Sequence, residues 1–117
     1  MFTREMLMDM FKQNEGYNFQ IYTDIACGEG LNGVSYYSFI GTNYTDDDRK
    51  HKGTTSVIKR FAKDYIVIEC SSEGRKWYCD AKREVYVPYN NIVMVDFVTD
   101  TTHPLYGYNG KHNFNEE

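Results

Sequence analysis

The two most strand-like runs of the chain are SVIKRFAKDYIVIEC (residues 56–70) and EVYVPYNNIVMVDFV (residues 84–98). Both are rich in β-branched and aromatic residues, which favour strands. The first run is broken by the triplet Lys63-Asp64-Tyr65, and the second turns at Pro88 and Asn90-Asn91. Long runs with such breaks are typical of a strongly bent antiparallel sheet or a small β-barrel. The sequence therefore predicts a mainly β fold, with a further strand at residues 76–81.

A short helix is predicted ahead of these strands. Thr3 is a favourable N-cap residue, and Glu5 adds a negative charge to the first turn. One apolar face follows at helical spacing, made by Met6, Leu7, Met10 and Phe11. The helix is expected over residues 3–14 and is stopped by Gly16. Because it is so short, it must pack against the rest of the domain to be stable.

A hairpin is predicted between the helix and the two runs quoted above. Residues 17–25 alternate between two sets of side chains, which predicts a half-buried strand. Residues 34–40 form a second strand with aromatic residues on both faces, and the glycine-rich residues 28–33 are expected to form the turn. We expect residues 1–98 to form a single domain and residues 99–117 to form an irregular tail.

Composition limits the class of protein. The 117 residues include eleven Tyr and seven Phe, which are too many aromatic residues for a disordered chain. The net charge is −4, but residues 1–48 carry −6, residues 49–84 carry +5 and residues 85–117 carry −3. Overall acidity argues against a protein that coats duplex nucleic acid. The basic middle segment still allows a local cationic pocket.

The cytoplasm is the expected compartment. The sequence has no run of about 18 apolar residues, so no membrane-spanning helix and no membrane partner are predicted. The N-terminus has no charged region followed by a long apolar stretch, so no signal peptide is predicted. The three cysteines, Cys27, Cys70 and Cys79, are an odd number that suits reduced thiols.

Two segments resemble motifs of the Sm-like fold, which includes the Hfq-type RNA chaperones. Residues 57–61 (VIKRF) followed by residues 64–68 (DYIVI) are similar to the first motif, in which a strand leads to an acidic residue, an aromatic residue and an apolar run. Residues 85–95 (VYVPYNNIVMV) are similar to the second motif, in which a one-turn 3₁₀ link between two strands contacts RNA. The resemblance implies a small barrel, RNA binding and a homo-oligomer assembled through edge strands.

The chain also departs from this family. Lys59 and Arg60 stand where the family has a glycine before the bend. Asn90-Asn91 stands where Hfq-type proteins have a basic residue and a histidine, and the hairpin predicted at residues 17–40 is an addition. SH3-like barrels give a similar strand pattern, so either kind of barrel is an expectation.

Cationic and aromatic residues alternate through the middle of the chain. The cations are Lys59, Arg60, Lys63, Arg75, Lys76, Lys82 and Arg83, and the aromatic residues are Phe61, Tyr65, Trp77 and Tyr78. Cations beside aromatic faces suit phosphates and stacked bases. The alternative is a solvated strand face on which Lys and Arg discourage pairing with other chains.

Other motifs predict no catalytic or metal site. Residues 28–33 spell GxGxxG, but a strand follows them instead of the helix that a dinucleotide site needs, so we expect a hairpin turn. Cys70 and Cys79, with His103 or His112, lack the tight spacing of zinc ligands; the two cysteines could instead face one another across a hairpin. The acidic run at residues 46–48 lacks the glycine of a calcium loop. No Ser or Cys lies in a nucleophile motif, and no cofactor is predicted.

The sequence favours a non-enzymatic, cytoplasmic homo-oligomer that binds a nucleotide or a short single-stranded RNA. Base contacts are assigned to Tyr65, Tyr89 and Asn90, and phosphate contacts to Lys59, Arg60 and Lys63. The alternative is an acidic inhibitor or adaptor that blocks a host protein by direct contact. In style the chain resembles phage or mobile-element accessory proteins, including those that disarm host defence. A protein that sequesters a nucleotide immune signal would combine both hypotheses.

Overall fold

The computed structural model of the chain describes residues 1–43, 56–71 and 82–99. Within these ranges, one helix precedes the strands of a β-sheet, which confirms the mainly β fold. The elements are α1 (Arg4–Gln13), β1 (Asn18–Gly30), β2 (Gly33–Thr42), β3 (Ser56–Phe61), β4 (Tyr65–Ser71), β5 (Lys82–Pro88), the 3₁₀ turn η2 (Tyr89–Asn91) and β6 (Ile92–Val98). The strand predicted at residues 76–81 and the tail from residue 100 lie outside the described residues.

The sheet is open and mixed, with the strand order β5-β4-β3-β2-β1-β6. Neighbouring strands are antiparallel except β2 and β3, which are parallel and pair at Gly41 and Ser56. The prediction of an antiparallel sheet is therefore wrong at this junction. The reason is that a long connection follows Thr42, whereas an antiparallel neighbour is usually reached through a tight hairpin.

A close approach of two backbones forms the junction between β2 and β3. A Cβ atom added to Gly41 would overlap the carbonyl oxygen of Ser56 and would lie 2.9 Å from Cζ of Phe19. Glycine is therefore required at this position. The pair joins two halves of the sheet, β6-β1-β2 on one side and β3-β4-β5 on the other.

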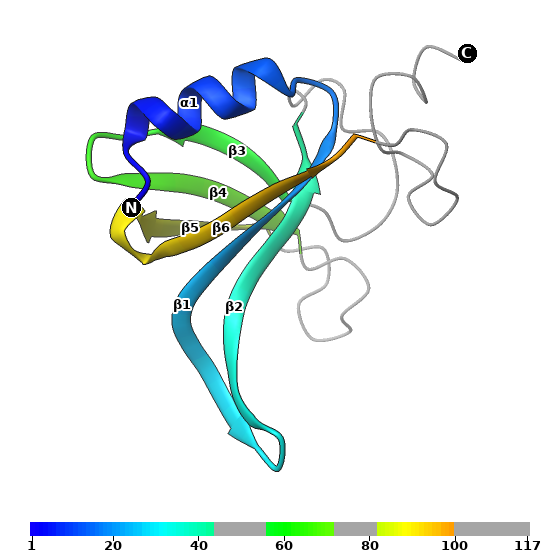
Figure 1. Cartoon of the computed structure of the whole chain (residues 1–117), viewed down its shortest axis with the longest axis vertical. Coiled ribbons are helices and arrows are strands. Elements are labelled where there is room, and N and C mark those ends of the chain that lie inside the picture. Colours follow the sequence, from blue (N-terminus) through cyan, green and yellow to red (C-terminus); the bar gives the residue numbers. More distant parts are fainter. Residues whose placement is uncertain (44–55, 72–81, 100–117) are drawn as a thin grey trace.

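The two halves of the sheet are also joined at their outer edges, where the chain passes from β5 to β6. β5 and β6 are the edge strands of the sheet, and the three residues of η2 are all that separates them along the chain. The sheet is accordingly curved, and its edges approach one another at η2, the yellow segment near the N-terminus in Figure 1. The turn predicted around Asn90-Asn91 is confirmed.

Helix α1 packs across both halves of the sheet (Figure 1). The ring of Phe11 makes edge-to-face contacts with three other rings, at centroid distances of 5.1 Å to Phe19 in β1, 4.9 Å to Phe97 in β6 and 5.7 Å to Phe61 in β3. Such contacts stabilise the packing beyond the area that they bury. Residues from all these elements form a single apolar core, to which the helix contributes Leu7 and Phe11.

The predicted N-cap of α1 is confirmed, the helix ends at Gln13 with Asn14 as its C-cap, and its apolar face is narrower than predicted. The hydroxyl of Thr3 accepts a hydrogen bond of 3.1 Å from the backbone N–H of Met6, so Thr3 is the N-cap. Leu7 and Phe11 are buried, but Met6 is 46% exposed. Met6 lies about 100° around the helix from Leu7, outside the stripe that faces the sheet.

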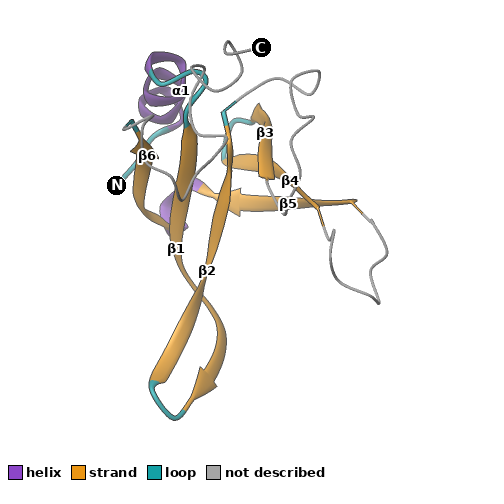
Figure 2. Ribbon diagram, turned by 90° about the vertical axis from the view of Figure 1, so that its right-hand side faces the viewer, coloured by secondary structure: helices purple, strands orange, loops and turns teal. Residues whose placement is uncertain are grey.

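The predicted hairpin of β1 and β2 is confirmed, with Phe19, Ile21 and Thr23 on its buried face. Its strands are longer than predicted, because Gly30 pairs with Gly33 and the turn consists of two residues. The positive φ of Gly33, 108°, closes this turn. Figures 1 and 2 show that the hairpin extends well beyond the rest of the sheet.

Candidate ligand-binding surface

Three side chains meet on the outer face of β3, β4 and β5, and we call this cluster the platform: Arg60, Tyr65 and Tyr86. Val67 lies two residues after Tyr65 and pairs with Arg60 on one side and with Tyr86 on the other, so the three platform side chains point to the same face of the sheet. Cζ of Arg60 lies 5.9 Å from the centroid of the Tyr86 ring. The ring centroids of Tyr65 and Tyr86 are 5.3 Å apart, with the planes tilted by 59°.

A β-bulge in β3 positions the cations of this surface. Ile58 pairs with Ile68, but Arg60 pairs with Val67, so Lys59 is an extra residue in β3. In a regular strand, Lys59 and Arg60 would point to opposite faces, and one of them would enter the core. The bulge removes this conflict, and both residues are exposed to solvent.

The platform is open to solvent, and two carboxylates lie beside it, those of Glu84 in β5 and of its cross-strand partner Glu69 in β4. Tyr86 is 51% exposed, and its hydroxyl donates a hydrogen bond of 3.1 Å to Oε1 of Glu84. Hydrogen bonding to Tyr86 raises the pKa of Arg60 above its usual value, and Tyr65 adds to this effect, while partial desolvation opposes it. The guanidinium is therefore charged at any physiological pH and lies against an exposed aromatic face.

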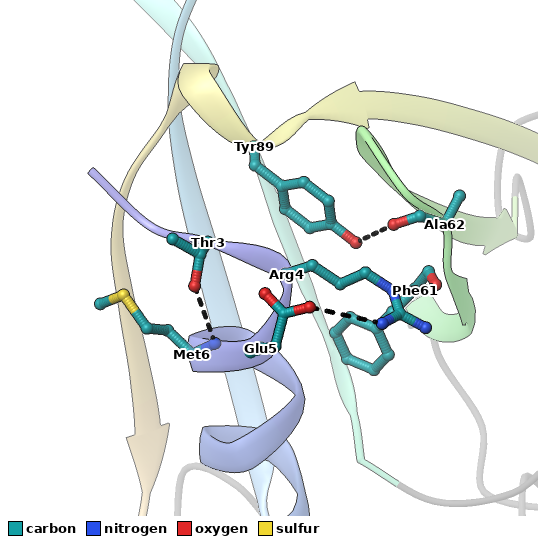
Figure 3. Close-up of polar contacts among 7 residues, drawn as sticks. All are labelled: Thr3, Arg4, Glu5, Met6, Phe61, Ala62 and Tyr89. Carbon is teal, nitrogen blue, oxygen red and sulfur yellow. Dashed lines mark hydrogen bonds and ion pairs between the residues drawn. The ribbon is translucent and has the colours of Figure 1, made fainter.

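A second set of residues surrounds a shallow hollow of about 700 Å³ at the corner where α1 begins. Lys63 and Asp64 reach it from the turn between β3 and β4, and Asn90 reaches it from η2. The side chain of Arg4 crosses this corner: its Nε donates a hydrogen bond of 3.0 Å to the carbonyl oxygen of Phe61, and its Nη1 lies 3.6 Å from Oε2 of Glu5 (Figure 3).

Tyr89 connects η2 to the turn between β3 and β4. Its side chain is only 6% exposed and belongs to the core, and its hydroxyl donates a hydrogen bond of 2.7 Å to the carbonyl oxygen of Ala62 (Figure 3). Its backbone N–H also donates to the carbonyl oxygen of Asp64, at 3.4 Å. Burial raises the pKa of the Tyr89 hydroxyl above its usual value. This ring has no free face on which a base can stack.

The six residues predicted from the sequence therefore fall into three groups. Arg60 and Tyr65 belong to the platform, and Lys59 lies next to them on the bulge. Lys63, Asn90 and Tyr89 line the hollow, but Tyr89 is buried and belongs to the core. The prediction did not include Tyr86, although its place between Val85 and Val87, which pack on the core, could have shown that it faces solvent.

The other motifs lead to no site in the part of the chain that the structure describes. In residues 1–43, 56–71 and 82–99, no group of three or more His, Cys, Asp or Glu could hold a metal ion. Cys70 is buried beside Ser56, whose hydroxyl donates to its sulfur at 3.6 Å, and Cys27 is exposed. The acidic run at residues 46–48, Cys79, His103 and His112 lie outside the described residues. None of the described helices is long and apolar enough to cross a membrane.

Comparison with known proteins adds no identification. No protein-family model matches the chain, and neither a curated protein nor a solved structure shows significant similarity to it.

Proposed function

We propose that this protein is a non-enzymatic, cytoplasmic binding protein that holds a nucleotide or a short single-stranded RNA on the platform. The observation that supports this most is the solvent-open packing of the Arg60 guanidinium against the ring of Tyr86, beside Tyr65. Aromatic faces stack on any base, and the planar guanidinium binds two phosphate oxygens at once. The same cluster thus offers one surface for a base and one group for a phosphate.

The charges around the platform suggest the direction in which the ligand lies. The base is placed on Tyr86 and Tyr65, and its phosphate is placed on Arg60. Lys63, in the turn next to Tyr65, extends the cationic surface toward the hollow that Asn90 lines. Glu84 lies on the other side of Tyr86 and repels phosphate. A chain longer than one nucleotide therefore continues toward Lys63 and away from Glu84.

The finer description of the fold is also a proposal: a small barrel of the Sm-like or SH3-like kind. Its support is the curvature of the sheet, the direct connection of its two edge strands through η2, and the helix that packs across both halves. The Sm-like resemblance further implies a homo-oligomer.

The binding proposal is tested with Arg60→Ala and Lys63→Ala. The probes are a short fluorescein-labelled oligoribonucleotide of mixed sequence and, in parallel, a fluorescent adenosine nucleotide. Each substitution is expected to weaken oligonucleotide binding and to lower the salt slope of log K by about 0.7 for each phosphate that is no longer neutralised. Lys12→Ala is the matched control, because it removes an exposed cation of α1. Unchanged affinity and salt slope in Arg60→Ala would reject the proposal.

The carboxylate of Glu84 gives a test of opposite sign. Glu84→Gln keeps an acceptor for the Tyr86 hydroxyl but removes one of the two negative charges beside the platform, while Glu69 stays in place. We expect this variant to bind the same oligoribonucleotide more tightly than the wild type, by a factor of a few. Weaker binding would mean that the phosphate does not lie near Glu84 and Arg60.

An acidic inhibitor or adaptor that blocks a host defence protein remains the second proposal. Its support within the described residues is the solvent face of α1, where Glu5 and Asp9 are exposed beside the half-exposed Met6 and Met8. Such a face would meet a basic, apolar surface on the target. Glu5→Lys combined with Asp9→Lys would abolish inhibition of a purified target under this proposal, whereas Arg60→Ala would not.

A further inference from the structure

The distal part of the β1–β2 hairpin is a two-stranded ribbon, and we call residues 24–38 the arm. β6 pairs with β1 only as far as Thr23, and β3 pairs with β2 at Gly41, so neither strand accompanies the arm. In the described part of the chain the arm is therefore bounded by two open edges, and it projects from the body in both views (Figures 1 and 2). An isolated two-stranded ribbon is marginally stable at best in water.

The two edges of the arm differ in how they are protected. The β1 edge carries Asp24 and Glu29, two glycines and two shifts of register, all of which discourage pairing with another strand. The β2 edge, residues 34–40 (VSYYSFI), has no charge, no proline and no glycine. Such a stretch of β-branched and aromatic residues is the kind that pairs with a further strand. Only one edge of the arm is therefore suited to association.

The side chains of this edge are unusually exposed for their type. Tyr36 is 53% exposed and Tyr37 is 49% exposed, on opposite faces of the ribbon, and Val34 and Ile40 are exposed to a similar degree. A tyrosine buries roughly 150–250 Å² when it is covered, so each of these leaves on the order of 100 Å² open to water. With Val34, Ile40 and the adjoining backbone, the edge offers on the order of a few hundred Å² per partner, which is the size of a small interface that dissociates reversibly.

The charge of the arm indicates which class of molecule can bind to its open edge. Residues 24–40 contain two carboxylates and no Lys or Arg, so neither nucleic acid nor an anionic membrane surface is attracted to it. A second copy of the same edge can pair with its open backbone groups, because antiparallel pairing about a two-fold axis is self-complementary. This pairing leaves the acidic β1 strands outermost and far apart.

We propose that the chain forms a two-fold symmetric dimer in which the β2 edges of two copies, residues 34–40, pair antiparallel and make a continuous four-stranded sheet. The interface is separate from the platform, which lies on β3, β4 and β5. The dimer therefore does not depend on the proposed ligand, and it would present two platforms to one chain of RNA.

Sedimentation equilibrium of the purified protein tests the dimer. The expected mass is twice 13.8 kDa at high concentration, with reversible dissociation on dilution. Tyr36→Lys and Tyr37→Lys each place two like charges close to the two-fold axis, and each is expected to raise the dissociation constant by at least about tenfold. Val93→Lys is the matched control, because Val93 is 56% exposed on the edge strand β6.

Hydrogen exchange of the unmodified protein supplies a second measurement that needs no variant. The amides of residues 34–40 are expected to become more protected as concentration rises, while those of residues 24–30 do not. A mass of one chain at every concentration would overturn the proposal. So would an assembly that survives both tyrosine substitutions and is lost in Val93→Lys, because that result would assign the interface to β6.

Discussion

At the scale of single residues, Tyr89 was predicted to contact a base, but in the structure it belongs to the core. Its ring is buried, and its hydroxyl bonds to the carbonyl oxygen of Ala62. Tyr89→Phe leaves this acceptor without its partner, and we expect a loss of about 1–2 kcal/mol in the free energy of unfolding measured with urea. Tyr86→Phe should cost less than about 0.5 kcal/mol, since Tyr86 is half exposed. Equal losses in both variants would contradict the structural role.

The titration of Tyr89 gives a pH dependence with a definite sign. Burial raises the pKa of its hydroxyl above the usual value of 10.0, so the folded state favours the protonated form. This contribution to stability is complete below the pKa of the unfolded chain and is lost as pH rises through the higher pKa of the folded protein. The wild type should therefore lose more stability above about pH 10 than Tyr89→Phe does. Urea unfolding at pH 8 and at about pH 10.5 checks the difference.

At the scale of elements, the junction of β2 and β3 depends on Gly41. Gly41→Ala drives a methyl group into the Ser56 carbonyl, and a loss of at least about 1–3 kcal/mol is expected, as for other overpacked sites. Gly30→Ala is the matched control, because a Cβ there meets nothing within 4 Å. Thermal unfolding of the two variants should show a large decrease in Tm for the first alone. A similar Tm for both would mean that the halves of the sheet are not held by this pair.

Helix α1 is expected to hold the two halves of the sheet together through Phe11. Phe11→Ala removes three ring contacts and leaves a cavity in the core, which should cost about 3–5 kcal/mol. Met8→Ala, on the exposed side of the same helix, should change stability by less than about 0.5 kcal/mol. Chemical denaturation measures both. A small loss in Phe11→Ala would mean that α1 is only loosely attached.

Local patterns predicted the elements well, because each depends on neighbouring residues. The N-cap at Thr3, the alternation of residues 17–25 and the turn at Asn90-Asn91 are of this kind, and all are confirmed. The parallel contact of β2 with β3 could not be predicted, since it depends on two residues, Gly41 and Ser56, that are distant along the chain.

The candidate site was predicted only in part for a similar reason. The pattern of cationic and aromatic residues predicted Arg60 and Tyr65 as site residues. It did not show which side chains lie beside them on adjacent strands, and these neighbours decide which residues form the cluster. Tyr86 belongs to the site because its register with Val67 places it beside Arg60 and Tyr65, and Tyr89 does not because its side chain is buried in the core. Lys59 and Arg60 are both exposed only because of a bulge, which nothing in their spacing indicates.

At the scale of the whole molecule, the structure separates two surfaces with different chemistry. The cationic and aromatic platform lies on β3, β4 and β5, and the uncharged edge of the arm lies on β2 at the far end of the hairpin. A ligand of the platform and a partner of the arm can therefore bind at the same time. Substitutions on one surface should leave the properties of the other unchanged.

The most direct test of the central proposal is to identify what the purified protein carries. The absorbance ratio at 260 and 280 nm is measured for the wild type and for Arg60→Ala combined with Tyr86→Ala, and the material released by heat is analysed by mass spectrometry. We expect a nucleotide or a short RNA from the wild type and its loss from the double variant. The same ligand in equal amount from both proteins, or a ligand-free wild type that also fails to bind the labelled oligoribonucleotide and nucleotide, would contradict the proposal that the platform is the binding site.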